Sequence, residues 1–422
     1  MTPVRGAASA VPYTSAVPRD ESPNYAARRL FVAALTVFIL IVAIGVPVAI
    51  LAPVPQASAT VLPAVAHTTA QAQPRFPAFG HSAIGVVGLP DVLATSGSQS
   101  PRPIASITKV VTALVVLEQR PLSGKDQGPS ITFTNRDVQI LQDVLNAGGS
   151  WQAVQPGWKL SERDAIETML IPSANNYAES LAIWAYGSVP KYLTAARAFL
   201  KAHHLDHTTL VDTNGLDSGD RSTPADLVAL GKLALAQPAI ASTVRMASAT
   251  EPQIGQITNT NELLGTAGID GIKTGTTDQA GACLLFSAKV DLGTRTVEVV
   301  GVILGAKTHS QLDATVPGLL TSVRKGLHDV PLADRNQVFA TYHTKWGGIA
   351  KAVAGRAASM LVWGRTSVAR VADVQPIRGG KKGEPVGRVT YRVGTRIMSV
   401  PLVLDRSVLA APVWWRLTHP LR

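Results

Sequence analysis

The run from Val110 to Leu117 constrains the fold more than any other stretch, because every residue in it except Thr112 is apolar. A helix with this pattern has to be covered by protein on all sides rather than along one stripe. Ser106 and Lys109 lie just before the run, one helical turn apart. At helical spacing their Cβ atoms lie about 5–6 Å apart on one face. The sequence therefore predicts a hydroxyl and an amine side by side at the start of a buried helix.

This pairing predicts a nucleophile and its base. A serine hydroxyl attacks poorly at neutral pH unless a base takes its proton, and a lysine acts as that base when burial or a neighbouring cation lowers its pKa. The positive end of the helix dipole favours negative charge on Ser106 Oγ and disfavours the ammonium form of Lys109. Taken alone, the pair has a commoner interpretation, an N-capping serine followed by a lysine that reaches solvent.

Two further stretches favour the catalytic interpretation. Ser173-Ala174-Asn175 follows the first pair in the chain, and Lys273-Thr274-Gly275 follows farther on. A Ser-x-x-Lys, a Ser-x-Asn and a Lys-Thr-Gly in this order resemble the motif set of the serine acyl enzymes that recognise penicillin. The order and spacing make the set specific, and its chemistry needs no cofactor and no metal.

Length and residue usage limit the remaining possibilities. A chain of 422 residues with 46% hydrophobic residues predicts two or three domains with a large core. The single cysteine, Cys283, cannot form an internal disulfide, and its apolar neighbours predict a small buried hydrophobe rather than a catalytic thiol. His203, His204 and His207 cluster, but no second group of ligands follows, which favours a polar helix end over a metal site.

The part of the chain before residue 77 predicts a membrane tether. Residues 1–29 are rich in Pro, Ala and Ser and predict a disordered cytoplasmic tail. Leu30–Ala52 carries no charge and is long enough to span a bilayer as a helix. Arg28 and Arg29 precede this run, so the positive-inside rule places everything after it outside the cytoplasm. Residues 53–76 predict a semi-extended linker rich in proline and alanine.

The apolar run allows a second interpretation, a signal peptide. Ala57-Ser58-Ala59 resembles a cleavage site, although the run is longer than an ordinary signal core. We therefore favour a retained single-pass anchor. Both interpretations leave the rest of the chain in the extracytoplasmic space.

Residues 77–328 predict an α+β domain. Helices are indicated at 162–171 and 224–235, each after a capping residue, Ser161 and Thr223. Short connections predict an antiparallel meander, and we expect its sheet to be flanked by helices. The strands are indicated at 83–88, 272–275, 282–290 and 296–304.

Residues 329–422 predict a small all-β domain with a strong positive charge. Alternating strands such as 386–393 are separated by Gly and Pro turns. From Lys345 onward 14 lysines and arginines stand against three acidic residues, a net charge of +11 that equals the excess of the whole chain. No nucleic-acid-binding motif accompanies this charge. We expect anionic lipid or an anionic wall polymer as a partner, or only a solvated basic surface.

These stretches together carry a family resemblance. The chain resembles the D-alanyl-D-alanine carboxypeptidases of the low-molecular-weight penicillin-binding proteins, whose catalytic domain has a β-lactamase/transpeptidase-like fold, over most of residues 80–327. The family commonly has Gly-Asn-Asp after the serine of the second motif, where this chain has Ala174-Asn175-Asn176 and keeps the required asparagine. The matching residues are 102–109, 173–178, 214–216, 222–227, 260–264, 271–276 and 280–281.

The resemblance implies roles for the first two motifs. Ser106 would attack the carbonyl between the two terminal D-alanines of a peptidoglycan stem peptide, with Lys109 as its base. Ser173 would pass a proton to the leaving amine, and Asn175 would hold the substrate amide and Lys109. Water would then hydrolyse the acyl-enzyme.

The third motif is implied to bind the substrate. Lys273 and Thr274 would hold the terminal carboxylate, and Gly275 would let the peptide lie along the strand edge. The backbone N–H groups of Ser106 and Thr276 would form the oxyanion hole. The resemblance thus implies an extracytoplasmic enzyme of the bacterial cell membrane that shapes the cell wall and is inhibited by β-lactams.

Three rival functions remain open. A class A β-lactamase would add a glutamate for deacylation, and no Glu-x-x-Leu-Asn pattern lies between Leu205 and Thr213. A transpeptidase differs only in whether an amine outcompetes water for the acyl-enzyme, which the sequence does not show. A membrane-tethered muropeptide or β-lactam sensor would need no base, so the complete motif set favours the enzyme.

Overall fold

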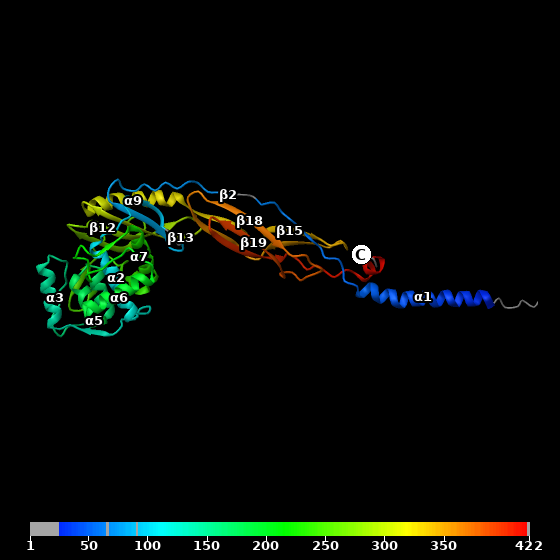
Figure 1. Ribbon diagram of the computed structural model, residues 1–422, viewed down its shortest axis with the longest axis horizontal. Coiled ribbons are helices and arrows are strands. Elements are labelled where there is room, and N and C mark those ends of the chain that lie inside the picture. Colours follow the sequence, from blue (N-terminus) through cyan, green and yellow to red (C-terminus); the bar gives the residue numbers. More distant parts are fainter. Residues whose placement is uncertain (1–24, 65–66, 90–91, 420–422) are drawn as a thin grey trace, which may run out of the picture.

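The computed structural model describes residues 25–64, 67–89 and 92–419, which form an elongated molecule (Figure 1). The helix α1 (Tyr25–Leu51) lies at one end, a strand-rich domain lies in the middle, and a domain of helices around a sheet forms the other end. Residues 1–24 of the predicted tail lie outside the described residues. The tail was predicted to end at residue 29, which is wrong for residues 25–29, because this stretch of Ala and Arg, both good helix formers, extends α1.

A five-stranded antiparallel sheet, ordered β11-β12-β13-β3-β4, forms the centre of the helix-rich domain. Successive side chains of β12 point to opposite faces: Cys283 and Leu285 pack toward α7 (Pro224–Ala236), and Leu284 and Phe286 toward α9 (His309–Gly326). Cys283 is fully buried, as predicted. The meander of three strands is confirmed, and β3 joins it beside β13. The strands are β3 (His81–Val86), β4 (Val92–Ser96), β11 (Ile269–Thr277), β12 (Gly281–Asp291) and β13 (Thr296–Ala306).

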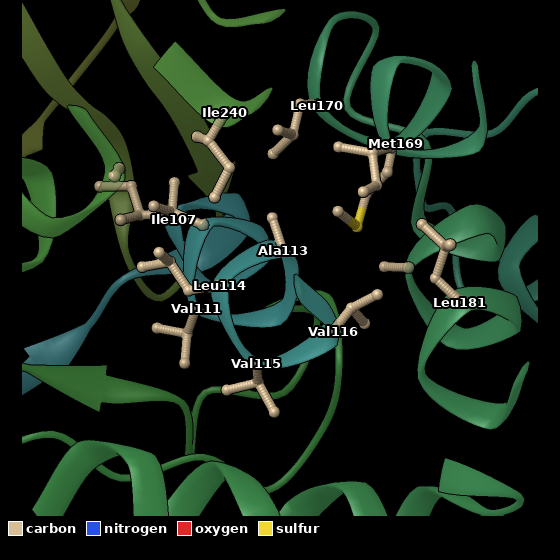
Figure 2. Close-up of a cluster of buried hydrophobic side chains, with 14 of the residues drawn as sticks. Ile107, Val111, Ala113, Leu114, Val115, Val116, Met169, Leu170, Leu181 and Ile240 are labelled. Atoms are coloured by element: carbon tan, nitrogen blue, oxygen red, sulfur yellow. The ribbon is translucent and has the colours of Figure 1, made fainter. Parts of the chain in front are cut away.

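The predicted buried helix is α2 (Thr108–Gln119), which follows a 3-10 turn, Ala105–Ile107. Every residue from Thr108 to Leu117 is buried. In Figure 2 its apolar side chains lie among Met169, Leu170 and Leu181 of neighbouring helices and Ile240. At roughly 1.5–3 kcal/mol for each buried Val, Leu or Ile side chain, this packing makes α2 a firm support for its N-terminus.

Further helices surround α2, and short strand pairs join them. The capping predictions are confirmed, since Ser161 caps α4 in a capping box with Asp164, and Thr223 caps α7. The helices are α3 (Asn135–Asn146), α4 (Glu162–Leu170), α5 (Asn175–Tyr186), α6 (Val189–Ala202) and α8 (Pro238–Thr243). The pairs are β5 (Arg102–Pro103) with β8 (Arg221–Ser222), β6 (Ser130–Thr132) with β7 (Lys159–Ser161), and β9 (Ser248–Glu251) with β10 (Gly255–Thr258).

The strand-rich domain is built on a sheet ordered β1-β15-β16-β20-β19-β18-β2, with the pair β14–β17 beside it. Its core is separate from that of the helix-rich domain and includes Phe339, Tyr342 and Leu402. After the last strand comes the short helix α10 (Val413–Thr418), which contacts α1. The strands are β14 (Leu327–Ala333), β15 (Val338–His343), β16 (Ile349–Ala354), β17 (Ala358–Trp363), β18 (Ser367–Val374), β19 (Pro385–Val393) and β20 (Arg396–Leu404).

The two edge strands of this sheet come from the predicted linker. β1 (Ala59–Val61) pairs with β15, and β2 (His67–Thr68) pairs with β18 on the opposite edge. Farther along, the N–H of Arg75 donates to Ser322 Oγ in α9. The linker is therefore extended, as its proline content predicts, but it covers the two sheet edges instead of standing free.

Candidate active site

Ser106 and Lys109 meet where the 3-10 turn passes into α2. Lys109 Nζ lies 2.8 Å from Ser106 Oγ and also donates to the carbonyl oxygen of Asn214 at 3.0 Å. The lysine is fully buried, and this burial, together with the ammonium of Lys273, lowers its pKa well below the ordinary value. A buried amine in this state can take the serine proton, so the predicted pairing of nucleophile and base is geometrically sound.

The turn that presents Ser106 has an unusual backbone. Ala105 adopts a left-handed φ of +45°, and its carbonyl group points at Gly215, where a Cβ atom would lie 1.9 Å from the Ala105 oxygen. Gly215 itself has a φ of +85°. Only glycine fits this position, since both the space and the backbone conformation exclude a side chain. The loop that contains Gly215 is thus packed directly under the nucleophile.

The third motif lies on β11, an edge strand of the sheet. Lys273, Thr274 and Gly275 are buried, and Thr276, the next residue, is exposed. A Cβ atom at Gly275 would lie 2.9 Å from the backbone nitrogen of Ser106, so the missing side chain lets the strand approach the turn. An edge strand with free backbone groups beside a nucleophile can receive an extended peptide as an additional strand.

Lys273 has partners that the motif alone does not reveal. Its Nζ atom donates to Thr260 Oγ1 at 3.3 Å, and Thr260 Oγ1 lies 2.5 Å from Thr274 Oγ1. Burial lowers the pKa of Lys273 to about 7. Thr260 was noticed in the sequence only as part of a stretch that resembles the family. Its place between Lys273 and Thr274 adds it to the candidate site.

Ser173 and Asn175 lie at the start of α5, a helix that packs against α2. Ser173 has a left-handed φ of +66°, and Asn175 is the first residue of the helix. No hydrogen bond joins either side chain to Ser106 or Lys109 among the described residues. Asn175 Oδ1 is buried and has no hydrogen-bond partner in that part of the chain. It can accept a hydrogen bond from a substrate N–H, but the roles of both residues remain predictions.

Two more groups join the site, although the sequence patterns assigned them no role. His309, the first residue of α9, places Nε2 2.6 Å from Thr276 Oγ1 across 33 positions of the chain. The Asn214 carbonyl reaches Lys109 across 105 positions. His309 lies outside the stretches that resemble the family, and Asn214 was noticed only as part of one of them. Neither contact could be predicted locally, because each depends on how distant elements pack.

The histidine cluster disperses in the structure. The ring of His203 packs on Phe199, and His207 lies 3.6 Å from a carboxylate oxygen of Asp226. Within the described ranges, no three His, Cys, Asp or Glu side chains gather where they could hold a metal ion.

Comparisons with known proteins agree with this geometry. The sequence profile of a family described as D-alanyl-D-alanine carboxypeptidase matches residues 89–308, just over half of the chain and all three motifs. Over 330 residues the chain is 28% identical to the D-alanyl-D-alanine carboxypeptidase DacC of Escherichia coli (strain K12). This match covers 75% of this chain and 81% of the relative's length. Over 252 residues it is 27% identical to the D-alanyl-D-alanine carboxypeptidase DacF of Bacillus subtilis (strain 168). That second match covers 58% of this chain and 61% of the relative's length.

A solved structure supports the fold. The crystal structure of a peptidoglycan synthesis regulatory factor (PBP3) from Streptococcus pneumoniae superimposes with a TM-score of 0.61 at 21% identity. The superposition covers 81% of this chain and 100% of that one. It confirms the predicted fold, an antiparallel sheet flanked by helices and followed by a strand-rich domain.

Proposed function

The chain belongs to the D-alanyl-D-alanine carboxypeptidase family, and on this premise we propose that it removes the terminal D-alanine from peptidoglycan stem peptides as a serine-type carboxypeptidase. The contact of 2.8 Å between Lys109 and Ser106 carries the proposal, because it joins a nucleophile to a base whose pKa burial lowers well below its ordinary value. The reaction serves the synthesis and remodelling of the cell wall.

The first half of the reaction forms an acyl-enzyme. Lys109 takes the proton of Ser106, and Ser106 Oγ attacks the carbonyl carbon between the two D-alanines. The backbone N–H groups of Ser106 and Thr276 stabilise the negative charge that develops on the carbonyl oxygen, which in other acyl enzymes contributes about 3–4 kcal/mol per donor. Ser173 relays the proton held by Lys109 to the leaving amine, D-alanine departs, and Lys109 is again able to accept a proton. Water then hydrolyses the ester, and the same base assists it.

The other motif residues hold the substrate. Lys273 supplies positive charge and Thr274 a hydroxyl group for the terminal carboxylate, and the stem peptide pairs with β11 past Gly275. Asn175 accepts the peptide N–H with its unpaired Oδ1. A penicillin presents a carboxylate and a reactive carbonyl in the same arrangement as the end of the stem peptide, so it acylates Ser106. The resulting acyl-enzyme is hydrolysed slowly.

The rival functions are less well supported. The family membership favours neither a β-lactamase nor a sensor. A sensor also has no use for the buried Lys109 in contact with Ser106. Burying an amine costs free energy, and the catalytic role of Lys109 explains why the fold accepts that cost.

The test is mass spectrometry of the full chain in detergent. A truncated chain that begins after the linker would lose β1 and β2, which cover both edges of a sheet. With benzylpenicillin we expect a persistent adduct on Ser106, and with a peptide that ends in D-Ala-D-Ala we expect released D-alanine. Ser106→Ala should abolish both. A wild-type chain without adduct or release, but with retained affinity for the peptide, would make the sensor the better account.

The N-terminal helix is proposed to anchor the enzyme in the bacterial membrane, with its catalytic domain outside the cytoplasm. α1 has a mean hydropathy of 2.9 and is long enough to cross a bilayer. Arg416 of α10 donates to the carbonyl groups of Ile50 and Ala52 at the end of α1, and Trp414 beside it is 75% exposed. An exposed tryptophan at the end of such a helix fits the boundary between membrane and water.

The anchor and the alternative signal peptide predict different mature proteins. A retained anchor leaves an intact mass of 44.3 kDa in the membrane fraction, released only by detergent. Cleavage after Ala59 would instead give a shorter, soluble chain in the same cells. We also propose a linker at 53–76, a catalytic domain at 77–328 and a β domain at 329–422 after the anchor. The anchor helix α1 begins at Tyr25, within the stretch that was assigned to the tail.

The basic β domain is proposed to bind an anionic partner, either anionic lipid or an anionic wall polymer. Arg335, Lys351 and Lys382 line a hollow of about 500 Å³, and none of them has an ion-pair partner among the described residues. The single carboxylate there, Asp405, already pairs with Arg406. The test measures binding of an anionic polymer to the full chain in neutral nanodiscs. The double variant Lys351→Gln, Lys382→Gln should bind the polymer more weakly, and its binding should depend less on salt. Lys289→Gln, in the catalytic domain, is the control and should change neither the affinity nor its salt dependence.

A further inference from the structure

A loop outside the three motifs lies directly behind the catalytic base. The segment from Asp212 to Asp220, here termed the acidic loop, contains Asn214, whose carbonyl oxygen accepts the hydrogen bond from Lys109 Nζ. This carbonyl and Ser106 Oγ together set the direction in which the amine of Lys109 points. The position of the base therefore depends on what holds the acidic loop in shape.

Asp212 organises the loop from within. Its Oδ1 atom accepts the N–H groups of Asn214 at 2.7 Å and Gly215 at 2.6 Å, and its Oδ2 atom accepts the N–H of Asp217 at 2.8 Å. Hydrogen bonds from backbone N–H groups to a carboxylate are among the stronger ones in proteins. The bonds from Asn214 and Gly215 fix the peptide unit that contains the Asn214 carbonyl, the acceptor for Lys109, and the unit before it, while the bond from Asp217 closes the loop behind them.

Asp220 ties the same loop to the nucleophile. The residue is fully buried, and its Oδ1 atom accepts the N–H of Val211 at 2.7 Å and of Asp212 at 3.2 Å. Its own carbonyl accepts the N–H of Ile104 at 3.1 Å, two residues before Ser106. One residue thus fixes the start of the acidic loop and the chain that leads into the 3-10 turn.

We propose that Asp212 and Asp220 are positioning residues for acylation. Asp212 holds the Asn214 carbonyl against Lys109, and Asp220 holds the 3-10 turn before α2 against the acidic loop. The amine of Lys109 and the hydroxyl of Ser106 therefore meet at reacting distance. The proposal rests on the function assigned above to Ser106 and Lys109. It adds two carboxyl groups that belong to none of the three motifs and that need not touch the substrate.

The charges around Lys109 support this arrangement. No acidic side chain forms an ion pair with Lys109 among the described residues, and the charged groups that act on it are Lys273 from β11 and Asp212 and Asp220 from the loop. Burial, and then the neighbouring Asp212, raises the pKa of Asp220 to about 8. Asp220 therefore favours its neutral form more than an exposed carboxyl group does.

The test is the rate constant for acylation by benzylpenicillin, measured on the full chain in detergent from pH 5 to 9. Asp220→Ala removes the acceptor for two N–H groups, and we expect acylation to slow about 10-fold to 100-fold, as misplaced reacting groups do. Asp220→Asn keeps an acceptor oxygen and resembles the neutral acid, so it should restore most of the rate at pH 7. Asp212→Asn should move the acid limb of the profile to lower pH, because a negative charge near Lys109 is lost.

A matched control separates positioning from stability. Asp226 is also a buried carboxylate, and it accepts the N–H of His207 and the hydroxyl of Thr208, away from Lys109. Asp226→Ala should lower the melting temperature and leave the pH profile in place. The proposal is overturned if folded Asp220→Ala acylates as fast as the wild type, or if Asp212→Asn leaves the acid limb unmoved. A wild-type chain that is never acylated would instead refute the proposed function itself.

Discussion

Gly275 of β11 lies so close to Ser106 that a Cβ atom on it would be 2.9 Å from the serine backbone nitrogen. This approach joins two motifs that lie far apart in the chain. It brings an edge strand and the start of a helix together in one surface.

Gly275→Ala should block the approach without unfolding the domain. The added methyl group must displace β11 or the turn, which misaligns the oxyanion donors, and the loss of one such donor typically slows acylation about 100-fold or more. Second-order acylation by benzylpenicillin measures the effect. Gly318→Ala, in the open middle of α9 with nothing within 4 Å of the new atom, is the control and should acylate normally. Equal rates for both variants would contradict the close approach.

The acylation rate should fall toward acid pH as Lys109 becomes charged. Burial and Lys273 hold the pKa of Lys109 well below its ordinary value, so the amine is neutral and active above that pKa and protonated below it. The rate constant should decrease about tenfold per pH unit on the acid side. Lys109→Arg, a permanent cation, should remove about 100-fold to 10,000-fold of the rate. A flat profile in the wild type would argue against Lys109 as the base.

Binding of the peptide should weaken as the pH rises through the pKa of Lys273. Burial lowers that pKa to about 7, so above this pH the unliganded site loses the positive charge that a carboxylate needs. We expect KM for a D-Ala-D-Ala peptide to increase from pH 7 to pH 9 while kcat changes less. A peptide with its terminal carboxylate converted to an amide should bind weakly with no such dependence. Parallel profiles for the two peptides would exclude Lys273 as the carboxylate-binding group.

Gly215→Ala should destabilise the catalytic domain more than a glycine change of the same backbone type. Gly215 and Gly157 have similar left-handed φ values, +85° and +87°, but a Cβ atom on Gly157 would meet nothing within 4 Å. Gly157→Ala therefore measures the conformational cost alone, about 1–2 kcal/mol. Gly215→Ala adds the clash with the Ala105 carbonyl and should unfold at lower denaturant concentration and acylate poorly. Equal losses of stability in the two variants would show that the loop around Gly215 moves away from the Ala105 carbonyl without an additional free-energy cost.

Local patterns in the sequence were enough for much of this protein. The apolar run before Leu117 predicted a helix buried on every side, and the spacing of Ser106 and Lys109 predicted their contact, because they stand nearly one helical turn apart. Capping residues such as Ser161 predicted where helices begin, since they satisfy backbone groups within the same few residues. The antiparallel meander was predicted from short connections, because a short connection can join two consecutive strands only when they lie side by side and antiparallel.

Only the tertiary structure decided what surrounds that pair. Asp212 and Asp220 look like ordinary turn residues until the loop packs under Ala105, and Thr260 becomes a partner of Lys273 only when two distant segments meet. The linker reads as a free tether, yet its backbone groups complete both edges of a sheet whose other strands come from the far end of the chain. The sequence determined the reacting groups because they lie on one helix turn, where geometry is local. Their positioning depends on contacts between remote segments, which arise from the packing of the whole chain and leave no local pattern.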